Sequence, residues 1–349
     1  MISFPLFFPK YKDINEVITV LSADIGGTKT SLGLFITEGE KLKLLKDATF
    51  SSKQYSSFYD VIEQFLKENK SIFPDVLSIG VAGPVVNGAV KLTNLPWTLD
   101  RDQLKLETGI KEVYLLNDLE ATAYGLAGVR DDDLAYIYES KQVIAGNMAV
   151  LAPGTGLGEA GMFWDGSAYR PFAAEGGHSE FSPRTDLDIE LLRFLHNQYE
   201  IVSWEHLLSG AGIYNIYKFL RDVQGYKEPA WLSEKLETED PAAVISHTAM
   251  RALNDCCTQT MENYITYLAR EATSLVLKLK ATGGLVLGGG IPPKIYPLLR
   301  SELFHQEFQK SDRMELLLGD VPVYIILNSK AALVGAAYYG AYAAYEISK

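Results

Sequence analysis

Cysteine is nearly absent from this chain of 349 residues, which contains only Cys256 and Cys257, next to each other. Neighbouring cysteines rarely form a disulfide, and no C-x-x-C pair is present to bind zinc. A chain of this length buries enough surface to fold without a disulfide or a structural metal. The cysteine content therefore predicts a protein of a reducing compartment, the cytoplasm.

Basic residues are too few to balance the acidic ones. Lys and Arg number 32 against 44 Asp and Glu, the formal net charge is -12, and no run of basic residues occurs. Such a charge disfavours nucleic acid and anionic membranes as partners. A phosphorylated ligand would need a local device, such as backbone N–H groups, a metal ion or one well-placed cation.

Long apolar runs are also missing. The longest late run, residues 331–344, is interrupted by Gly335 and Gly340 and is shorter than the roughly 18 residues that a membrane-spanning helix needs. The apolar N-terminal extension, residues 1–16, has neither the basic start nor the cleavage site of a signal peptide. We expect this extension to be an arm lying on the body of the protein.

Strands and helices are expected to alternate along the chain. Phe58, Val61, Ile62, Phe65 and Leu66 follow the helical period, with a serine just before them to cap the helix. The order of elements predicts an α/β fold of about two domains, with a boundary near Asn117 and a helical middle. Strands are predicted at residues 17–23, 30–36, 42–50, 76–81, 113–116, 148–151, 160–164, 285–287 and 321–327, and further helices at 119–127, 187–195, 204–208, 212–220, 241–252, 261–279 and 330–347.

Three glycine-rich turns each follow an apolar strand: residues 24–29 (DIGGTK), 154–158 (GTGLG) and 288–290 (GGG). Glycine lets backbone N–H groups approach a phosphate closely. None of the three is a Walker loop or a Rossmann fingerprint, and each alone is most often a simple turn. Together they favour nucleotide binding.

Side chains beside these turns add chemistry that suits a nucleotide. The Asp24 carboxylate at a strand end suits Mg²⁺ bound through water. Thr28 and Thr155 can offer hydroxyl groups to phosphate oxygens. Lys29 either supplies a cation or is simply solvated.

A second group of polar residues suits a neutral sugar. Asn117 and Asp118 end a predicted strand, where α/β proteins place ligands. Asp118 either acts as a general base on a substrate hydroxyl or caps the next helix. Glu175-Gly-Gly-His178 joins a carboxylate and an imidazole through a flexible turn, whereas Glu205 alone would be a surface carboxylate. Carboxylates, an amide and an imidazole without cations match the hydroxyl groups of a polyol.

These motifs, in this order, resemble the bacterial glucokinases, which are hexokinase-like sugar kinases of the actin, Hsp70 and sugar-kinase superfamily. The resemblance runs from about Leu21 to Tyr339. It lies in residues 23–29 (ADIGGTK) and 152–158 (APGTGLG) as phosphate loops, 115–118 (LLND) as the strand with the catalytic aspartate, 175–181 (EGGHSEF) as the sugar-binding loop, 207–212 (LLSGAG) after a further sugar-binding glutamate, and 284–290 (GLVLGGG) as the adenosine motif.

The resemblance implies a two-lobed actin-like ATPase fold, ribonuclease H-like, with mixed sheets and an active-site cleft between the lobes. Residues 1–117 and 330–349 would form a small lobe and residues 118–329 a large one. The implied function is ATP-dependent phosphorylation of glucose to glucose 6-phosphate, with Mg²⁺ as cofactor, in a homodimer that binds neither nucleic acid nor membrane.

The site residues follow from the motifs and the resemblance together. Asp118 is expected to be the catalytic base. The expected sugar-binding residues are Asn117, Asp118, Glu175, His178, Glu205 and Asn94, and the expected nucleotide-binding residues are Asp24, Gly26, Gly27, Thr28, Lys29, Thr155, Gly156, Gly289 and Gly290, with Asp24 holding Mg²⁺ through water.

The chain departs from its apparent relatives at two places. Many proteobacterial glucokinases have Asn in place of Lys29 and Arg two places later, whereas Lys29-Thr-Ser31 is closer to cyanobacterial and ROK-type loops. ROK kinases carry a cysteine-rich zinc motif after their histidine, but residues 179–183 (SEFSP) contain no cysteine. Zinc is therefore not expected.

Three alternatives remain open at this point. They are a kinase for another hexose or an N-acetylhexosamine, a kinase that uses ADP or polyphosphate, and a non-catalytic sugar sensor on the same fold. The presence of both Asp24 and Asp118 argues against a sensor, because sensing requires no base.

Overall fold

The computed structural model describes residues 6, 17–38, 41–68, 72–92, 94–129, 133–140 and 144–347, with the side chains of residues 344–347 left out. Contacts divide the chain into two compact units, one of residues 1–133, 162–173 and 328–349 and the other of residues 134–161 and 174–327. The expected N-terminal arm lies outside the described residues apart from Leu6, which forms a bridge with Tyr169. The lobe boundaries expected at residues 117 and 330 remain predictions.

The first unit contains a five-stranded sheet in the order β3-β2-β1-β4-β7. The strands β1 and β2 form the expected antiparallel hairpin, which places Asp24 opposite Ser31. β4 and β7 continue the sheet parallel to β1, so the carboxyl ends of these three strands lie at one edge. The strands are β1 (Thr19–Ile25), β2 (Lys29–Glu38), β3 (Lys41–Ser51), β4 (Val76–Val81) and β7 (Glu112–Asn117).

Helices pack against this sheet, and capping residues mark where they begin. The helix α1 (Phe58–Lys67) begins where the sequence predicts, because Ser57 and Asp60 form a reciprocal capping box. It buries Phe58, Val61 and Phe65 against the sheet core. The remaining elements of this unit are α2 (Arg101–Thr108), α3 (Asp118–Gly125), the ribbon of β5 (Ala89–Lys91) and β6 (Thr98–Asp100), and the terminal α12 (Ala331–Ile347).

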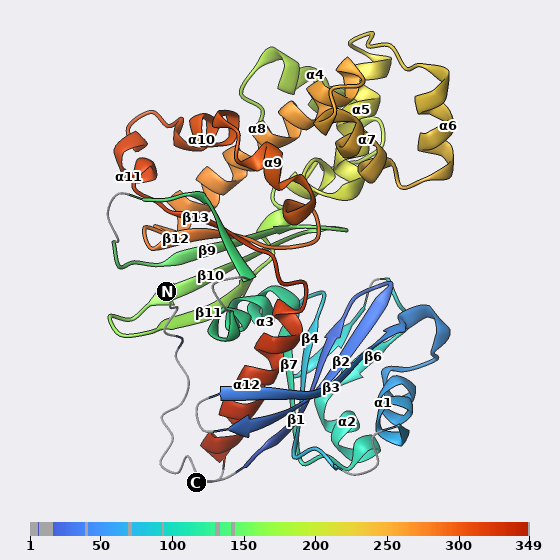
Figure 1. Ribbon diagram of the computed structural model, residues 1–349, viewed down its shortest axis with the longest axis vertical. Helices are drawn as coiled ribbons and strands as arrows, with labels where there is room; N and C mark the ends of the chain where they lie inside the picture. The colour runs from blue at the N-terminus through green and yellow to red at the C-terminus, as the bar shows by residue number, and fades with distance from the viewer. Residues whose placement is uncertain are drawn as a thin grey trace. The chain divides into compact units, whose positions relative to one another are not determined.

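The terminal helix α12 lies along α3 and crosses the sheet (Figure 1). The Ser22 hydroxyl of β1 donates a 2.6 Å hydrogen bond to the Leu333 carbonyl, which fixes the helix to the central strand. Small residues permit the close approach, as the sequence suggests. A Cβ atom on Gly335 would lie 1.7 Å from the Ala121 carbonyl oxygen of α3.

The second sheet has six strands in the order β11-β10-β9-β12-β13-β8. β9, β12 and β13 are parallel, and β8 is antiparallel to β13. The first five strands of this sheet therefore follow the same pattern as the first sheet. In both sheets, two outer strands are followed by three strands that run parallel to one another. The strands are β8 (Leu134–Tyr138), β9 (Met148–Pro153), β10 (Leu157–Trp164), β11 (Tyr169–Ala174), β12 (Gly284–Leu287) and β13 (Val323–Ile326).

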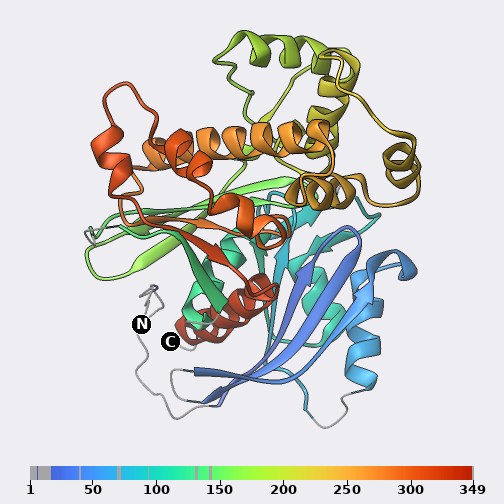
Figure 2. The same cartoon turned by 45° about the horizontal axis from the view of Figure 1, so that its top comes forward.

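The long helix α8 (Asp255–Leu279) forms the centre of the helical part of the second unit (Figure 2). Its Arg270 donates a 2.7 Å hydrogen bond to Asp188, and Tyr267 donates to the other oxygen of the same carboxylate. The other helices are α4 (Asp186–His196), α5 (Gly210–Asp222), α6 (Ala230–Thr238), α7 (Pro241–Met250), α9 (Tyr296–Leu299), α10 (Glu302–Gln309) and α11 (Glu315–Gly319).

The prediction of a helix over residues 204–208 is wrong. The structure has one turn of 3₁₀-helix, Trp204–His206, because Ser203 and His206 cap it reciprocally and α5 begins at Gly210. Several elements have no counterpart among the predicted ones, namely the helices α2, α6, α9, α10 and α11 and the strands β5, β6, β8 and β11. None of the helices in the described part of the chain is both long and apolar enough to cross a membrane.

We expect Gly335→Ala to destabilise the protein. Alanine favours a helix over glycine by up to about 1 kcal/mol, but the new methyl group overlaps backbone atoms of α3, and overpacking costs about 1–3 kcal/mol or more. We therefore predict that urea denaturation shows an unfolding free energy lowered by about 2 kcal/mol.

Gly319→Ala is the matched control, because its Cβ would meet only the flexible end of Gln309, at 3.4 Å. We expect this variant to stay within about 0.5 kcal/mol of the parent protein. Equal stability of the two variants would show that α12 does not pack against α3 in this way.

Candidate functional site

The carboxyl edge of the first sheet brings together residues from three strands. Asp24 of β1 is in register with Gly80 of β4, and Asn117 of β7 is in register with Val81. Asp118, the first residue of α3, follows directly. A Cβ on Gly80 would lie 3.9 Å from the Asp118 Cα, so the helix starts close to the strand between the two aspartates.

Asp24 has an environment that favours a positive ligand. Burial raises the pKa of this carboxyl group from 3.8 to about 6. Among the described residues, no N–H, O–H or cationic group forms a hydrogen bond or ion pair with its side chain. A half-buried carboxylate that loses part of its hydration without gaining a partner is destabilised, and a divalent cation that keeps most of its water would offset the cost.

The first glycine turn is held by its own backbone and by a serine. The Gly26 N–H donates to the Lys29 carbonyl at 2.9 Å, and the buried Ser52 hydroxyl donates to the Gly26 carbonyl at 2.9 Å. A Cβ on Gly27 would lie 2.8 Å from the Asn94 Cβ, so the turn and the expected sugar residue Asn94 are in contact. Thr28 and Lys29 are exposed.

The role of Ser52 was not predicted from the sequence, since an isolated serine after a strand carries no signal.

The helix cap at the end of β7 is Asn117 rather than Asp118. The Asn117 side-chain oxygen accepts hydrogen bonds from the Leu119 and Glu120 amides, and its amide donates to the Gly83 carbonyl at 3.3 Å. The Asp118 carboxylate accepts from the Leu119 N–H at 2.9 Å and is half-buried. The local geometry thus assigns the capping role to the asparagine.

The second and third glycine turns meet in the second unit. The Gly154 N–H donates to the Gly156 carbonyl at 2.8 Å, which closes the second turn. Gly289 has φ +78°, and a Cβ there would lie 2.4 Å from the Pro153 carbonyl oxygen. Only glycine fits both the backbone angle and the space. Thr155 is exposed and Gly290 faces open space, as a surface that receives a ligand requires.

Glu205 supports the second glycine turn directly. Its carboxylate accepts a 2.9 Å hydrogen bond from the Leu157 N–H, and a Cβ on Gly156 would lie 2.4 Å from the same oxygen. Glu205 is half-buried rather than a free surface carboxylate. The expected sugar residue and the expected phosphate loop are therefore in contact.

The Glu175–His178 segment forms a tight turn beside Glu205. Gly176–His178 is a short 3₁₀-helix, and both Glu175 and His178 are exposed at its ends. Burial lowers the pKa of the neighbouring His206, and the charges of Glu205 and His178 also act on it. Glu205 and His178 thus lie close enough to His206 for both to affect its pKa.

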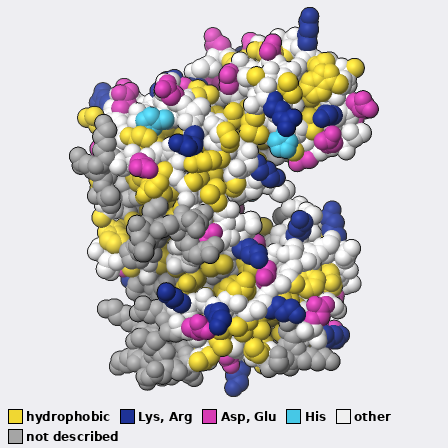
Figure 3. Space-filling model, in the orientation of Figure 1, with side chains coloured by type: hydrophobic (Ala, Val, Ile, Leu, Met, Phe, Trp, Pro, Cys, Tyr) yellow, Lys and Arg dark blue, Asp and Glu magenta, His cyan; other side chains and the backbone are white. Residues whose placement is uncertain are grey.

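Acidic side chains outnumber basic ones in this chain, 44 to 32. Figure 3 shows Lys and Arg side chains scattered singly among acidic ones on the visible face. Within the described ranges, no group of three His, Cys, Asp or Glu side chains is arranged to hold a metal ion. Among the residues of the three glycine turns, the exposed Lys29 is the one cationic side chain.

Comparison with known proteins identifies relatives over most of the chain. The glucokinase family model matches residues 21–343. A glucokinase from Nostoc punctiforme is 36% identical over 334 residues, which cover 91% of this chain and 97% of that protein.

Solved structures agree with this similarity. A glucokinase from an Antarctic psychrotroph has a TM-score of 0.78 and 29% identity, covering 93% of this chain and 98% of that one. A ROK family glucokinase from Streptomyces griseus, solved with glucose and AMPPNP, has a TM-score of 0.60 and 20% identity, covering 93% and 99%. These likenesses confirm the expected fold class, a mixed α/β fold of the actin-like ATPase type.

Proposed function

Since the chain belongs to the glucokinase family, we propose that it transfers the γ-phosphoryl group of ATP to the 6-hydroxyl of glucose. The observation that carries this proposal is the pair of aspartates at one sheet edge, Asp24 after β1 and Asp118 after β7. One suits a hydrated cation, and the other suits a proton-accepting role. Phosphoryl transfer needs both, together with donors that neutralise developing charge.

In this proposal Asp118 accepts the proton of the sugar 6-hydroxyl. Its Oδ1 is held by the Leu119 N–H, which fixes the orientation of the carboxylate. Glucose would be bound by the polar side chains of Asn117, Glu175, His178, Glu205 and Asn94. Asn117 would contribute through its side-chain amide, since its oxygen caps α3.

The nucleotide would be bound by the three glycine turns. Backbone N–H groups near Gly26, Gly27, Gly156, Gly289 and Gly290 would meet the phosphates, with the hydroxyls of Thr28 and Thr155 and the exposed Lys29 beside them. Asp24 would hold Mg²⁺ through water, and the ion would neutralise charge on the phosphates when bound. The glucose and AMPPNP in the Streptomyces griseus structure support this pair of substrates.

We further propose that the enzyme acts in the cytoplasm, in glycolysis, as a homodimer with a small lobe of residues 1–117 and 330–349 and a large lobe of residues 118–329. The two cysteines are free and buried, which suits a reducing compartment.

A coupled assay with several sugars and phosphoryl donors tests the substrate assignment. We expect kcat/KM for glucose with ATP to exceed the values for mannose, fructose and N-acetylglucosamine, and ADP and polyphosphate to give no turnover. Higher activity on an N-acetylhexosamine would replace glucose as the substrate. Tight glucose binding without turnover of any sugar would instead indicate a sensor.

Asp118→Asn tests the base. The amide keeps the size of the side chain and can still accept from the Leu119 N–H, but it cannot take a proton. We expect kcat to fall about 10³-fold, within the usual range for general base catalysis, while the glucose Kd from calorimetry is nearly unchanged. Glu120→Gln, two residues along α3, is the control and should keep its kcat. A near-normal kcat in Asp118→Asn would remove this residue from catalysis.

Asp24 gives a pH dependence of known sign. Its pKa is about 6, so the carboxylate is protonated as the pH falls below 6 and the attraction for Mg²⁺ is lost. We expect the affinity for Mg-ATP, measured by calorimetry, to fall about tenfold between pH 7 and pH 5. Asp24→Asn should bind weakly at both pH values, with no such change. If the affinity of Asp24→Asn for Mg-ATP still fell tenfold between pH 7 and pH 5, the group that titrates would be another residue.

A further inference from the structure

Two fully buried glutamates face each other in the second unit. Glu159 of β10 is 3% exposed and Glu271 of α8 is 0% exposed. Each carboxyl group shifts the pKa of the other, so the two groups lie close enough to interact. Within the described part of the chain, no N–H or hydroxyl donor reaches Glu159 Oε1 or either oxygen of Glu271. Two buried carboxyl groups that lack other partners and act on each other cannot both ionise, so we infer that the pair holds a proton.

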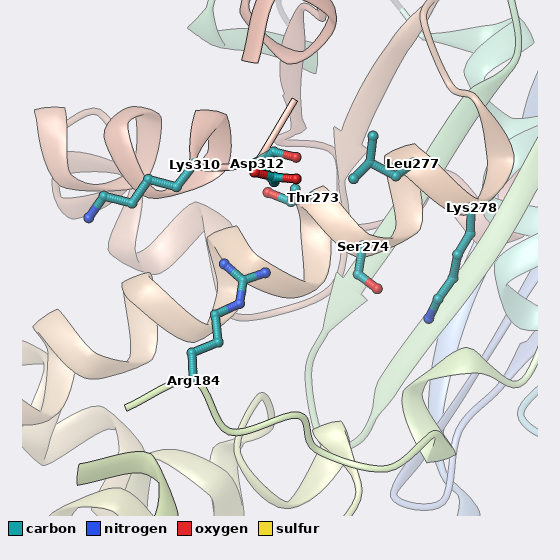
Figure 4. Close-up of a pocket in the computed structure, with 8 residues that line it drawn as sticks. Arg184, Thr273, Ser274, Leu277, Lys278, Lys310 and Asp312 are labelled. Atoms are coloured by element: carbon teal, nitrogen blue, oxygen red, sulfur yellow. The ribbon is translucent and has the colours of Figure 1, made fainter. Parts of the chain in front are cut away.

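The charged side chains around Glu159 and Glu271 do not neutralise the pair. Lys278 of α8 and Arg184 from the loop before α4 act on Glu271, but neither forms an ion pair with the two glutamates among the described residues. Both cations line a pocket of about 550 Å³ on α8. Figure 4 shows Arg184 reaching from its loop toward α8 and Lys278 extending from the C-terminal end of that helix.

The other elements packed against α8 offer no better partner. The strands β9 and β12 carry no titratable side chain. On α10, Glu307 pairs with Lys310 and lies 3.9 Å from Arg270. The charges of α5 and α7 are not among the interactions that shift the pKa of Glu271.

We assign the shared proton to Glu271. Burial and the charge of Glu159 raise the pKa of Glu271 from 4.5 to about 8. Burial also raises the pKa of Glu159, whereas its hydrogen bond to Glu271 lowers it. Near neutral pH, Glu271 is therefore the neutral acid that donates to the Glu159 carboxylate.

Glu159 lies directly against the turn between Glu175 and His178. A Cβ on Gly176 would lie 1.9 Å from Glu159 Oε2, and a Cβ on Gly177 would lie 2.0 Å from the Leu157 carbonyl oxygen. The double glycine thus lets the turn rest on the first residues of β10. Because no side chain lies between them, the position of the Glu159 carboxylate limits how closely Gly176 can approach β10.

We propose that Glu159 and Glu271 are positioning residues for the sugar-binding turn. The proton donated by Glu271 keeps the Glu159 carboxylate in the place against which Gly176 packs, and its loss brings two buried negative charges together and shifts the turn. This inference rests on the proposed role of Glu175 and His178 in binding glucose.

The test is the glucose Kd of the full-length protein as a function of pH, measured by calorimetry so that it does not depend on turnover. If only the protonated pair binds well, the Kd rises about tenfold between pH 7 and pH 9, given a pKa of about 8. In Glu271→Gln the amide donates to Glu159 at every pH. We expect this variant to match the parent protein at pH 7 and to lose most of the rise at pH 9.

An alkaline rise of the same size in Glu271→Gln would overturn the proposal, as would a flat profile in the parent protein. Binding that follows the expected pH dependence without any turnover would contradict the proposed kinase activity but support the positioning role.

Hydrogen exchange on the parent protein provides a test that needs no variant. The N–H groups of His178 and Ser179 donate within the turn, to the Glu175 and Gly176 carbonyls. After correction for intrinsic rates, we expect their protection to fall between pH 7 and pH 9. The Gly109 N–H, which donates to the Lys105 carbonyl at the end of α2, is the control and should keep its protection. Equal behaviour at both places would contradict the proposal.

Discussion

The shared edge of parallel strands is the constraint on which the rest of this structure depends. Because β1, β4 and β7 run parallel, the residues after each strand emerge on the same side of the first sheet, and two aspartates that are far apart in sequence come near one another. The second sheet repeats this with β9 and β12, which brings two glycine turns into contact. Because acidic residues outnumber basic ones, the proposed phosphate binding relies on the backbone N–H groups of the glycine turns. Glycine is required where a Cβ would collide, as at Gly289.

Two buried or half-buried glutamates contact the turns of the second unit. Glu205 accepts the Leu157 N–H under the second glycine turn, and Glu159, two residues further along β10, lies under the turn at Gly176. The beginning of one strand thus joins a turn proposed for nucleotide binding to one proposed for sugar binding. In the proposed pair, a proton on Glu271 would reduce the cost of burying Glu159.

Local signals in the sequence predicted much of the fold. The period of α1 and its capping serine, the hairpin of β1 and β2, and the small residues of α12 are all readable from neighbouring residues. α6 was missed because Pro229 precedes it without a side-chain cap and only Leu232 and Leu236 are buried. The site motifs were recognisable because glycine and acidic residues recur after strands. Glu159 and Glu271 were not, since neither belongs to a recognisable motif and their proximity depends on the packing of α8 against the second sheet.

The most direct test of the central claim is the identity of the product. Purified protein would be incubated with glucose, ATP and Mg²⁺, and the product examined by ³¹P and ¹³C NMR. We predict a single phosphorylated sugar whose phosphorus couples to C6, namely glucose 6-phosphate. Phosphorus coupled to C1, or the absence of any phosphorylated sugar, would contradict it.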